Sequence, residues 1–208
     1  MKIKINILFC ALVIGTQMIA NAQTTASSVP VKGSPYLQEK YVDGVIYYAD
    51  KNITAPLRYN AFQDLLEYQE NGKALVLDAT MVIQKAQLGN LVFVPHKYDL
   101  GGKSKLGYFE LLDSGKVMLL SKRTIAFAPE KKGKALDGGD MPAEYKRKPD
   151  TYYYKVGSGG LQEVTSIQSF ISSFPDKQEE LTKYAKKQKI SPRKEKELVQ
   201  LIDYYNSL

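Results

Sequence analysis

The chain has 208 residues, of which 44% are hydrophobic, with a formal net charge of +7 and a single cysteine. This length suits one compact domain, or one domain with a small appendage. A single cysteine excludes an internal disulfide framework, and the mild positive excess needs no explanation beyond solubility.

The first residues have the layout of a secretory signal peptide. Lys2 and Lys4 form a short basic start, an apolar run follows over residues 7–14, and Ala20-Asn21-Ala22 supplies the small residues of a cleavage site. The apolar run is well short of the ~20 residues that a membrane-spanning helix needs, and no later segment is apolar enough to span. We therefore predict a signal peptide over residues 1–22, export to the periplasm or the medium, and no transmembrane segment.

The cysteine falls inside this predicted leader. Cys10 lies within the apolar run and follows the bulky Phe9, a layout that argues against lipidation. Cleavage after Ala22 would remove Cys10 and lower the formal charge to +5, because Lys2 and Lys4 leave with it. Outside the cytoplasm an anionic partner would be a lipid headgroup, lipopolysaccharide or an acidic glycan rather than nucleic acid.

Residues 23–32 are rich in Thr, Ser and Pro and predict a flexible tether. From residue 33 to residue 164, short apolar or alternating runs are separated by turn residues, which indicates consecutive antiparallel strands. Residues 129–149 interrupt this β-rich domain with few apolar side chains and predict a surface loop or linker. The predicted strands are Gly44–Ala49, Pro56–Tyr59, Leu65–Glu70, Ala74–Asp78, Val82–Leu88, Leu91–Val94, Leu106–Asp113, Lys116–Ala128, Thr151–Val156 and Leu161–Val164.

Three short turns suggest hairpins. Asn71-Gly72 accepts positive φ at both central positions, which is the type I′ geometry that matches the twist of the flanking strands. Gly89-Asn90 and Asp113-Ser114-Gly115 are the other two. Consecutive hairpins of this kind favour a meander.

Residues 165–208 change period from two to about 3.6. They predict helices over Ser166–Phe174, Gln178–Gln188 and Lys194–Tyr205, and this helical unit is too short to bury a core alone. The fold class we expect is α+β. An antiparallel sheet of roughly eight to ten strands would curve into a sandwich or an open barrel, with the C-terminal helices packed on it.

The sequence contains no catalytic constellation, cofactor motif or metal site that we can recognise. His96 is the only histidine and is predicted to lie in a loop after a strand, without a G-x-S-x-G turn elsewhere. Gly101-Gly102-Lys103-Ser104 lacks the first glycine of a phosphate-binding loop, because Lys97 occupies that position. One histidine cannot make a multi-histidine metal site, and the acidic residues show no calcium-loop spacing. We expect a protein that is not an enzyme.

Tyrosines offer the main hint of ligand binding. In a strand, Tyr152 and Tyr154 would share one face while Tyr153 points away, so the pair could stack against a sugar or a peptide. The alternative is that these rings pack across strands and against the helical unit. The basic residues of that unit could also touch an anionic membrane, although a protein core would use up its narrow apolar stripes.

Several segments resemble a family of secreted proteins from Gram-negative bacteria. The resemblance lies in Ala55–Asn60, in Leu65–Tyr68 with its Asn71-Gly72 turn, in the strand Gly107–Leu112 and in the closing Tyr204–Leu208. It implies export and a sheet followed by a helical tail, and it assigns no activity and no catalytic residue. More loosely, the run of hairpins is similar to the half-barrel of periplasmic lipoprotein carriers, which implies a cavity for a hydrophobic ligand.

Three functions remain open at this level. The first is a non-enzymatic periplasmic or secreted binding module for a protein, glycan or lipid of the cell envelope. The alternative is a carrier of a lipid or other hydrophobic ligand inside the curved sheet, with an enzyme of another type in third place. A large apolar cavity would favour the carrier, and a filled interior with an exposed tyrosine patch would favour the binding module.

Overall fold

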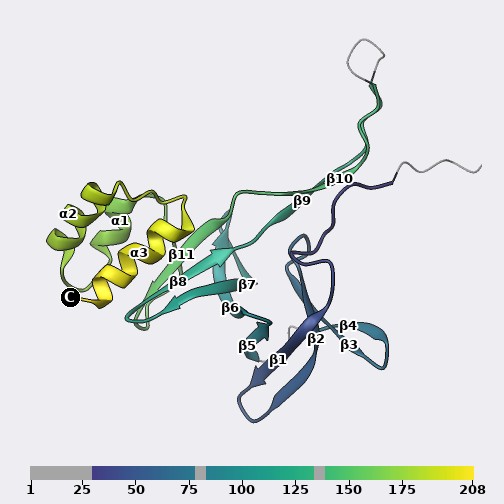
Figure 1. Ribbon diagram of the computed structural model, residues 1–208, viewed down its shortest axis with the longest axis horizontal. Helices are drawn as coiled ribbons and strands as arrows, with labels where there is room; N and C mark the ends of the chain where they lie inside the picture. Colours follow the sequence, from purple (N-terminus) through teal and green to yellow (C-terminus); the bar gives the residue numbers. More distant parts are fainter. Residues whose placement is uncertain (1–29, 78–82, 134–138) are drawn as a thin grey trace, which may run out of the picture.

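The computed structural model describes residues 30–77, 83–133 and 139–208, and its fold is α+β (Figure 1). Ten antiparallel strands form one curled sheet, a half-barrel, against which three C-terminal helices pack. The predicted fold class is confirmed. Across these residues, none of the helices has both the length and the apolar character needed to traverse a bilayer. The predicted signal peptide over residues 1–22 and residues 23–29 of the predicted tether lie outside the described residues.

Neighbouring strands of the large sheet follow the order β12-β11-β8-β7-β6-β5-β1-β2-β3-β4, while β9 and β10 form a separate pair. This order is mostly that of a meander, because most neighbours in the sheet are also neighbours in the chain. The strands are β1 (Val42–Tyr48), β2 (Asn52–Asn60), β3 (Leu65–Glu70), β4 (Lys73–Val76), β5 (Ile83–Leu88), β6 (Leu91–Leu100), β7 (Lys103–Ser114), β8 (Val117–Lys122), β9 (Ile125–Ala128), β10 (Glu144–Arg147), β11 (Thr151–Val156) and β12 (Gln162–Glu163).

The three predicted hairpins are confirmed. Asn71 and Gly72 both have positive φ, 52° and 75°, as a type I′ turn between β3 and β4 requires. The turn at residues 89–90 joins β5 to β6. At the turn between β7 and β8, the amide of Gly115 donates to the Asp113 carboxylate at 2.8 Å, and the ladder shifts register just before it. The ends of predicted strands at residues 78 and 82 lie outside the described residues.

The prediction of a loop around His96 is wrong. β6 continues to Leu100, and His96 pairs with Gly107 on β7. The turn of this hairpin is formed by Gly101 and Gly102, whose φ values are both positive. In the outer half of β6 only Tyr98 is buried, against Phe109, and the residues beside it are exposed or half-buried, so the sequence carries too little apolar alternation to predict a strand there.

A second correction concerns residues 116–149. The predicted strand Lys116–Ala128 is two strands, because β8 ends at Lys122 and β9 leaves the sheet. β9 pairs with β10 inside the predicted loop, and the two project from the body as an arm (Figure 1). Lys32 pairs alongside Glu144 of β10 in parallel, so the end of the predicted tether is already part of this arm. Backbone pairing builds the arm with few buried side chains.

The inner face of the sheet is defined by a row of directly paired residues on four strands: Phe93, Glu110, Ser121 and Tyr152. At the β1–β6 end this face encloses a barrel core, which consists of Ile46, Tyr48, Leu57, Tyr59, Ala61, Leu66, Leu77, Ile83, Ala86, Leu88, Phe93, Tyr108 and Ile125. At the β8–β11 end the three helices cover it. The helices are α1 (Ile167–Ser172), α2 (Gln178–Gln188) and α3 (Glu195–Asn206).

The interface between helices and sheet is a second buried cluster, the helical core. Its aromatic rings form a chain in which Phe170 contacts Tyr154 at 4.9 Å and Phe174 contacts Tyr205 at 4.7 Å between ring centroids. Burying rings of this size is a main source of stability for a sheet–helix interface. The buried members are Val117, Leu119, Tyr152, Tyr154, Val164, Phe170, Ile171, Phe174, Leu181, Ala185, Ile190, Leu198, Leu201, Ile202 and Tyr205.

A glycine in β1 tests how tightly the sheet is packed. A Cβ atom at Gly44 would lie 2.5 Å from the carbonyl oxygen of Gln87 and 2.5 Å from a Leu57 methyl group. Gly44→Ala is therefore expected to lower the free energy of unfolding by about 1–3 kcal/mol in urea denaturation, because overpacked sites force the backbone apart. Gly160→Ala is the control, because its added Cβ meets nothing within 4 Å. Equal effects of the two changes would contradict this account.

Candidate functional site

Three clusters of buried polar side chains hold the sheet together, and two of them involve the end of β8. Ser121, Lys122 and Arg123 follow one another in the chain and are all buried. Charged side chains are almost never buried without partners, so each of these lysine and arginine side chains must meet carboxylates. Lys122 and Arg123 were not predicted to have a functional role, because they lay within the predicted strand Lys116–Ala128. A run of three polar residues in a strand indicates a polar cluster only once the structure shows that all three are buried.

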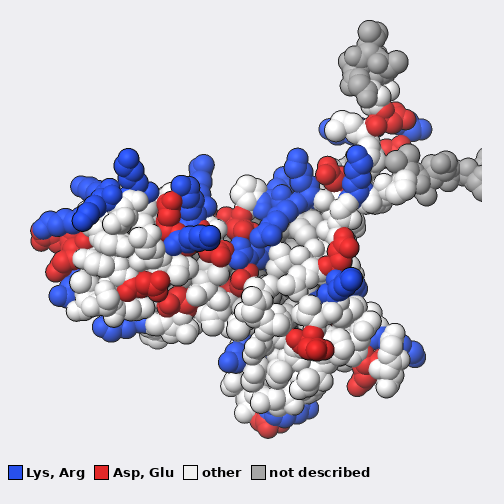
Figure 2. Space-filling model, in the orientation of Figure 1, with Lys and Arg blue, Asp and Glu red and all other residues white. Residues whose placement is uncertain are grey.

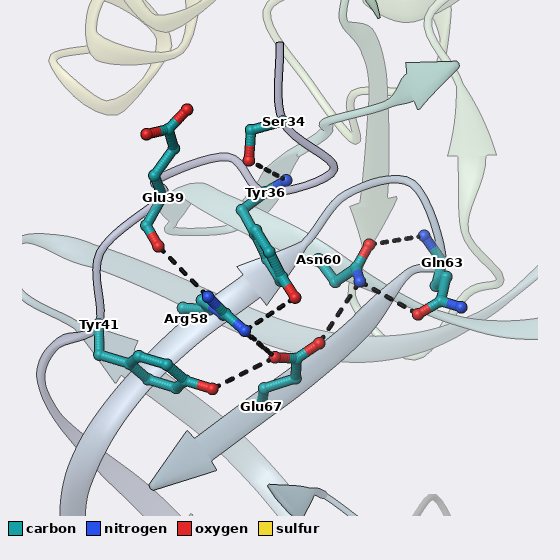
Figure 3. A network of polar contacts seen from close by, with 8 residues as sticks. All are labelled: Ser34, Tyr36, Glu39, Tyr41, Arg58, Asn60, Gln63 and Glu67. Carbon is teal, nitrogen blue, oxygen red and sulfur yellow. Dashed lines mark hydrogen bonds and ion pairs between the residues drawn. The ribbon is translucent and has the colours of Figure 1, made fainter. Parts of the chain in front are cut away.

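The first cluster surrounds Arg58 on β2 (Figure 3). Its guanidinium binds the Glu67 carboxylate at 2.7 Å and donates to the Tyr36 hydroxyl at 2.7 Å. The rings of Tyr36 and Tyr41 lie 3.5 and 4.3 Å from the same guanidinium carbon, as measured to the ring centroids. This cluster fastens residues 34–41 to the sheet, and its groups are satisfied by one another.

The second cluster surrounds Asp64, in the turn between β2 and β3. Its Oδ1 accepts hydrogen bonds from the Tyr59 hydroxyl at 2.8 Å and from the amide of Tyr108 at 3.0 Å, while Oδ2 lies 2.6 Å from the Lys122 ammonium. The contact joins β2–β3 to β7 and β8 and so holds the curl of the sheet closed. Burial lowers the pKa of Lys122, although Asp64 acts in the opposite direction.

The third cluster surrounds Arg123, whose side chain is 8% exposed. The guanidinium contacts Glu110 at 2.6 Å, Asp150 at 2.6 Å and Glu195 at 2.7 Å. Burial opposes the charged form, but hydrogen bonding to Glu110 and the charges of all three carboxylates raise the pKa of Arg123. One side chain thereby joins β7, the chain before β11 and the first turn of α3.

This third cluster lies on the inner face between the barrel core and the helical core, and we call it the polar seam. Glu110 is paired with Phe93 of the barrel core on one side and with Ser121 on the other. Ser121 in turn pairs with Tyr152 of the helical core. The seam consists of Glu110, Ser121, Arg123, Asp150 and Glu195.

Open space borders the seam. A groove of about 370 Å³, the seam groove, lies beside Asp150 and Tyr152 where the sheet meets the α2–α3 connection. Glu163 and Arg193 add one charge of each sign to its lining. A smaller hollow of about 250 Å³ lies against Glu110 and Arg123. The remaining lining residues of the seam groove are Pro149, Thr151, Val164, Thr165 and Pro192.

The structure places the two predicted binding tyrosines under the helices. Tyr152 and Tyr154 do share a face, but they are only 6% and 4% exposed. The two tyrosines therefore do not form the open stacking platform that we expected, because the helical core covers both rings. Tyr152 is also one of the residues that line the seam groove. Tyr153 points to the opposite face, where it contacts Phe109 at 5.1 Å between ring centroids.

The features considered for catalysis are dispersed. His96 lies in β6, where its ring is near that of Phe109. Burial, and to a smaller extent the charge of Lys155, lowers the pKa of its imidazole. Among residues 30–77, 83–133 and 139–208, no three His, Cys, Asp or Glu side chains are grouped so that they could hold a metal ion.

Searches against protein-family models, curated proteins and solved structures find no match to this chain.

Removing the central cation of the seam should be costly. Arg123→Met is expected to lower the free energy of unfolding by about 3 kcal/mol, because it leaves the buried carboxylate of Glu110 without a counter-charge. Arg147→Met removes a guanidinium that contacts the same Asp150 at 3.1 Å from a side chain 55% exposed, and should cost less than about 1 kcal/mol. Thermal or urea unfolding of the two variants measures both losses of stability. Similar losses would show that Arg123 has no special role.

The Asp64 cluster predicts a loss of stability in alkali. Burial, reinforced by the charge of Asp64, raises the pKa of Tyr108 to about 12 and also raises that of Tyr59. In the unfolded chain both hydroxyls ionise near pH 10, so above that pH the folded state retains protons that the unfolded state loses. Stability should then fall by about 1.4 kcal/mol per pH unit for each tyrosine.

The window for this test lies between pH 10.5 and about 12. Below its ordinary pKa of 10.5, Lys122 acts in the opposite direction because its pKa is lowered in the folded state. The urea midpoint at pH 11.5 should therefore be lower than the midpoint at pH 10.5. In Tyr108→Phe the difference between the two midpoints should be smaller. A midpoint that is constant or rises across this interval would contradict the assignment.

Proposed function

We propose that this chain is an exported, non-enzymatic binding module of the cell envelope that holds a polar glycan in the seam groove. The observation that carries the proposal is the groove itself, which has about 370 Å³ of space at the junction of sheet and helices. Binding sites for small molecules are concave, of roughly 300–1,000 Å³, and concentrate at junctions between structural units. The leader-like residues 1–22 support the exported location.

The chemistry of the lining favours a hydroxylated ligand. Asp150 and Glu163 supply acceptors, Arg193 supplies donors, and two threonines supply groups that do both. Because charges of both signs line the same groove, a strongly charged ligand would meet a like charge wherever it lay. A sugar satisfies donors and acceptors together without a net charge, and Pro149, Val164 and Pro192 give the groove apolar surface for its C–H groups to contact.

The packing of the barrel core supports a binding module over a carrier. The hollow between Leu37, Tyr59, Leu88 and Phe93 leaves no space for a water molecule. Tyr59 and Phe93, the largest of these side chains, are fully buried and their ring centroids lie 4.6 Å apart. A lipid carrier of the half-barrel kind needs its apolar volume at this place.

The proposal is tested with purified protein on an array of envelope oligosaccharides, followed by calorimetry with the soluble oligosaccharide that binds best. Glu163→Gln combined with Arg193→Gln should weaken binding about tenfold, because both changes remove charge-assisted hydrogen bonds from the groove. The matched control is Glu70→Gln with Lys73→Gln, a pair at the β3–β4 turn with the same two changes in charge.

Two results would count against the proposal. One is the absence of saturable glycan binding by the unmodified protein. The other is an equal loss of binding in the groove variant and in the β3–β4 variant, which would mean that the glycan does not contact the seam groove.

A further inference from the structure

A second groove lies within the helical unit, between α1 and α2, and we call it the helical groove. Its volume is about 350 Å³. Its apolar lining comes from Ile167 and Ile171 on α1 and from Ala185 and Ile190 at the end of α2. It shares no lining residue with the seam groove, so what binds here is independent of the proposed glycan site.

Two lysines, together with Gln168 and Thr182, complete the lining of the helical groove. Lys186 and Lys189 are both exposed, and neither has a carboxylate within ion-pairing distance among the described residues. Elsewhere in the helical unit such pairs do form, as for Lys183 with Glu179 at 2.6 Å. Figure 2 shows basic side chains gathered along the upper edge of the helical unit. The groove thus combines an apolar floor with unpaired positive charge.

This combination fits one class of ligand. We propose that the helical groove binds a free fatty acid, with its acyl chain on the isoleucine floor and its carboxylate between Lys186 and Lys189. The volume lies at the low end of the range for small-molecule sites, which suits one acyl chain and not the two of a phospholipid. An amphipathic partner helix would need anchor pockets over several turns, whereas this groove is lined on one side only by the six-residue α1.

A structural role of these lysines must be distinguished from a role in ligand binding. Lys186 and Lys187 lie in the last turn of α2, where positive charge complements the helix dipole. Lys187 shares this role but does not line the groove. A loss of binding specific to Lys186 and Lys189 therefore separates a ligand contact from a contribution to the helix.

The experiment is calorimetric titration of the full protein with sodium decanoate below its micelle concentration. Decanol and decyltrimethylammonium supply the same chain with a neutral and a cationic head. Saturable one-to-one binding of decanoate is expected, with decanol at least about fivefold weaker, because the exposed lysines contribute modestly to each contact. Lys186→Gln with Lys189→Gln should weaken decanoate binding about tenfold.

The control is Lys183→Gln with Lys187→Gln, which removes the same charge from α2 outside the groove and should leave binding within about twofold. Thermal unfolding of both double variants checks that the helical unit is intact. The proposal is overturned if decanol binds as tightly as decanoate, if both double variants lose binding equally, or if the protein binds phosphatidylglycerol vesicles but no monomeric decanoate.

Discussion

The ion pairs of the Arg123 guanidinium are the interaction on which the arrangement of sheet and helices depends. The guanidinium is buried beside Glu110 of the sheet, Asp150 before β11 and Glu195 at the start of α3, so sheet and helices meet at one cation. Burying such a group is favourable only when its partners are in place, and the penalty for losing one partner is large. The hydrophobic cores on either side supply most of the stability, while the seam specifies where each core ends.

Asp64 performs the equivalent task within the half-barrel. A ten-stranded open sheet tends to curl, and the curl must be closed by some contact between strands that are distant in the chain. Here the β2–β3 turn reaches the amide of Tyr108 and the ammonium of Lys122. Lys122 and Arg123 are adjacent in sequence but point to opposite faces of the sheet, so the end of β8 contributes to both closures.

The distribution of space follows from this packing and bears on function. The interior of the curl is filled by Tyr59, Phe93 and their neighbours, whereas the grooves lie at junctions, one beside the seam and one between α1 and α2. Junctions leave such space because separately formed elements with their own packing cannot match perfectly along their common edge. A polar junction and an apolar, lysine-bordered one suit different ligands, which is why the two proposals are independent.

The sequence by itself determined the elements whose signals are local. Period-two and period-3.6 patterns predicted the strands and the helical unit, and Asn71-Gly72 predicted its turn because only a few residue types accept positive φ. The outer half of β6 and the arm strand β10 were missed, since backbone pairing needs no apolar pattern. The tertiary structure alone decided that helices cover Tyr152 and Tyr154, and that Arg123 meets Glu110, Asp150 and Glu195. These choices depend on contacts between residues far apart in the chain, which no local periodicity records.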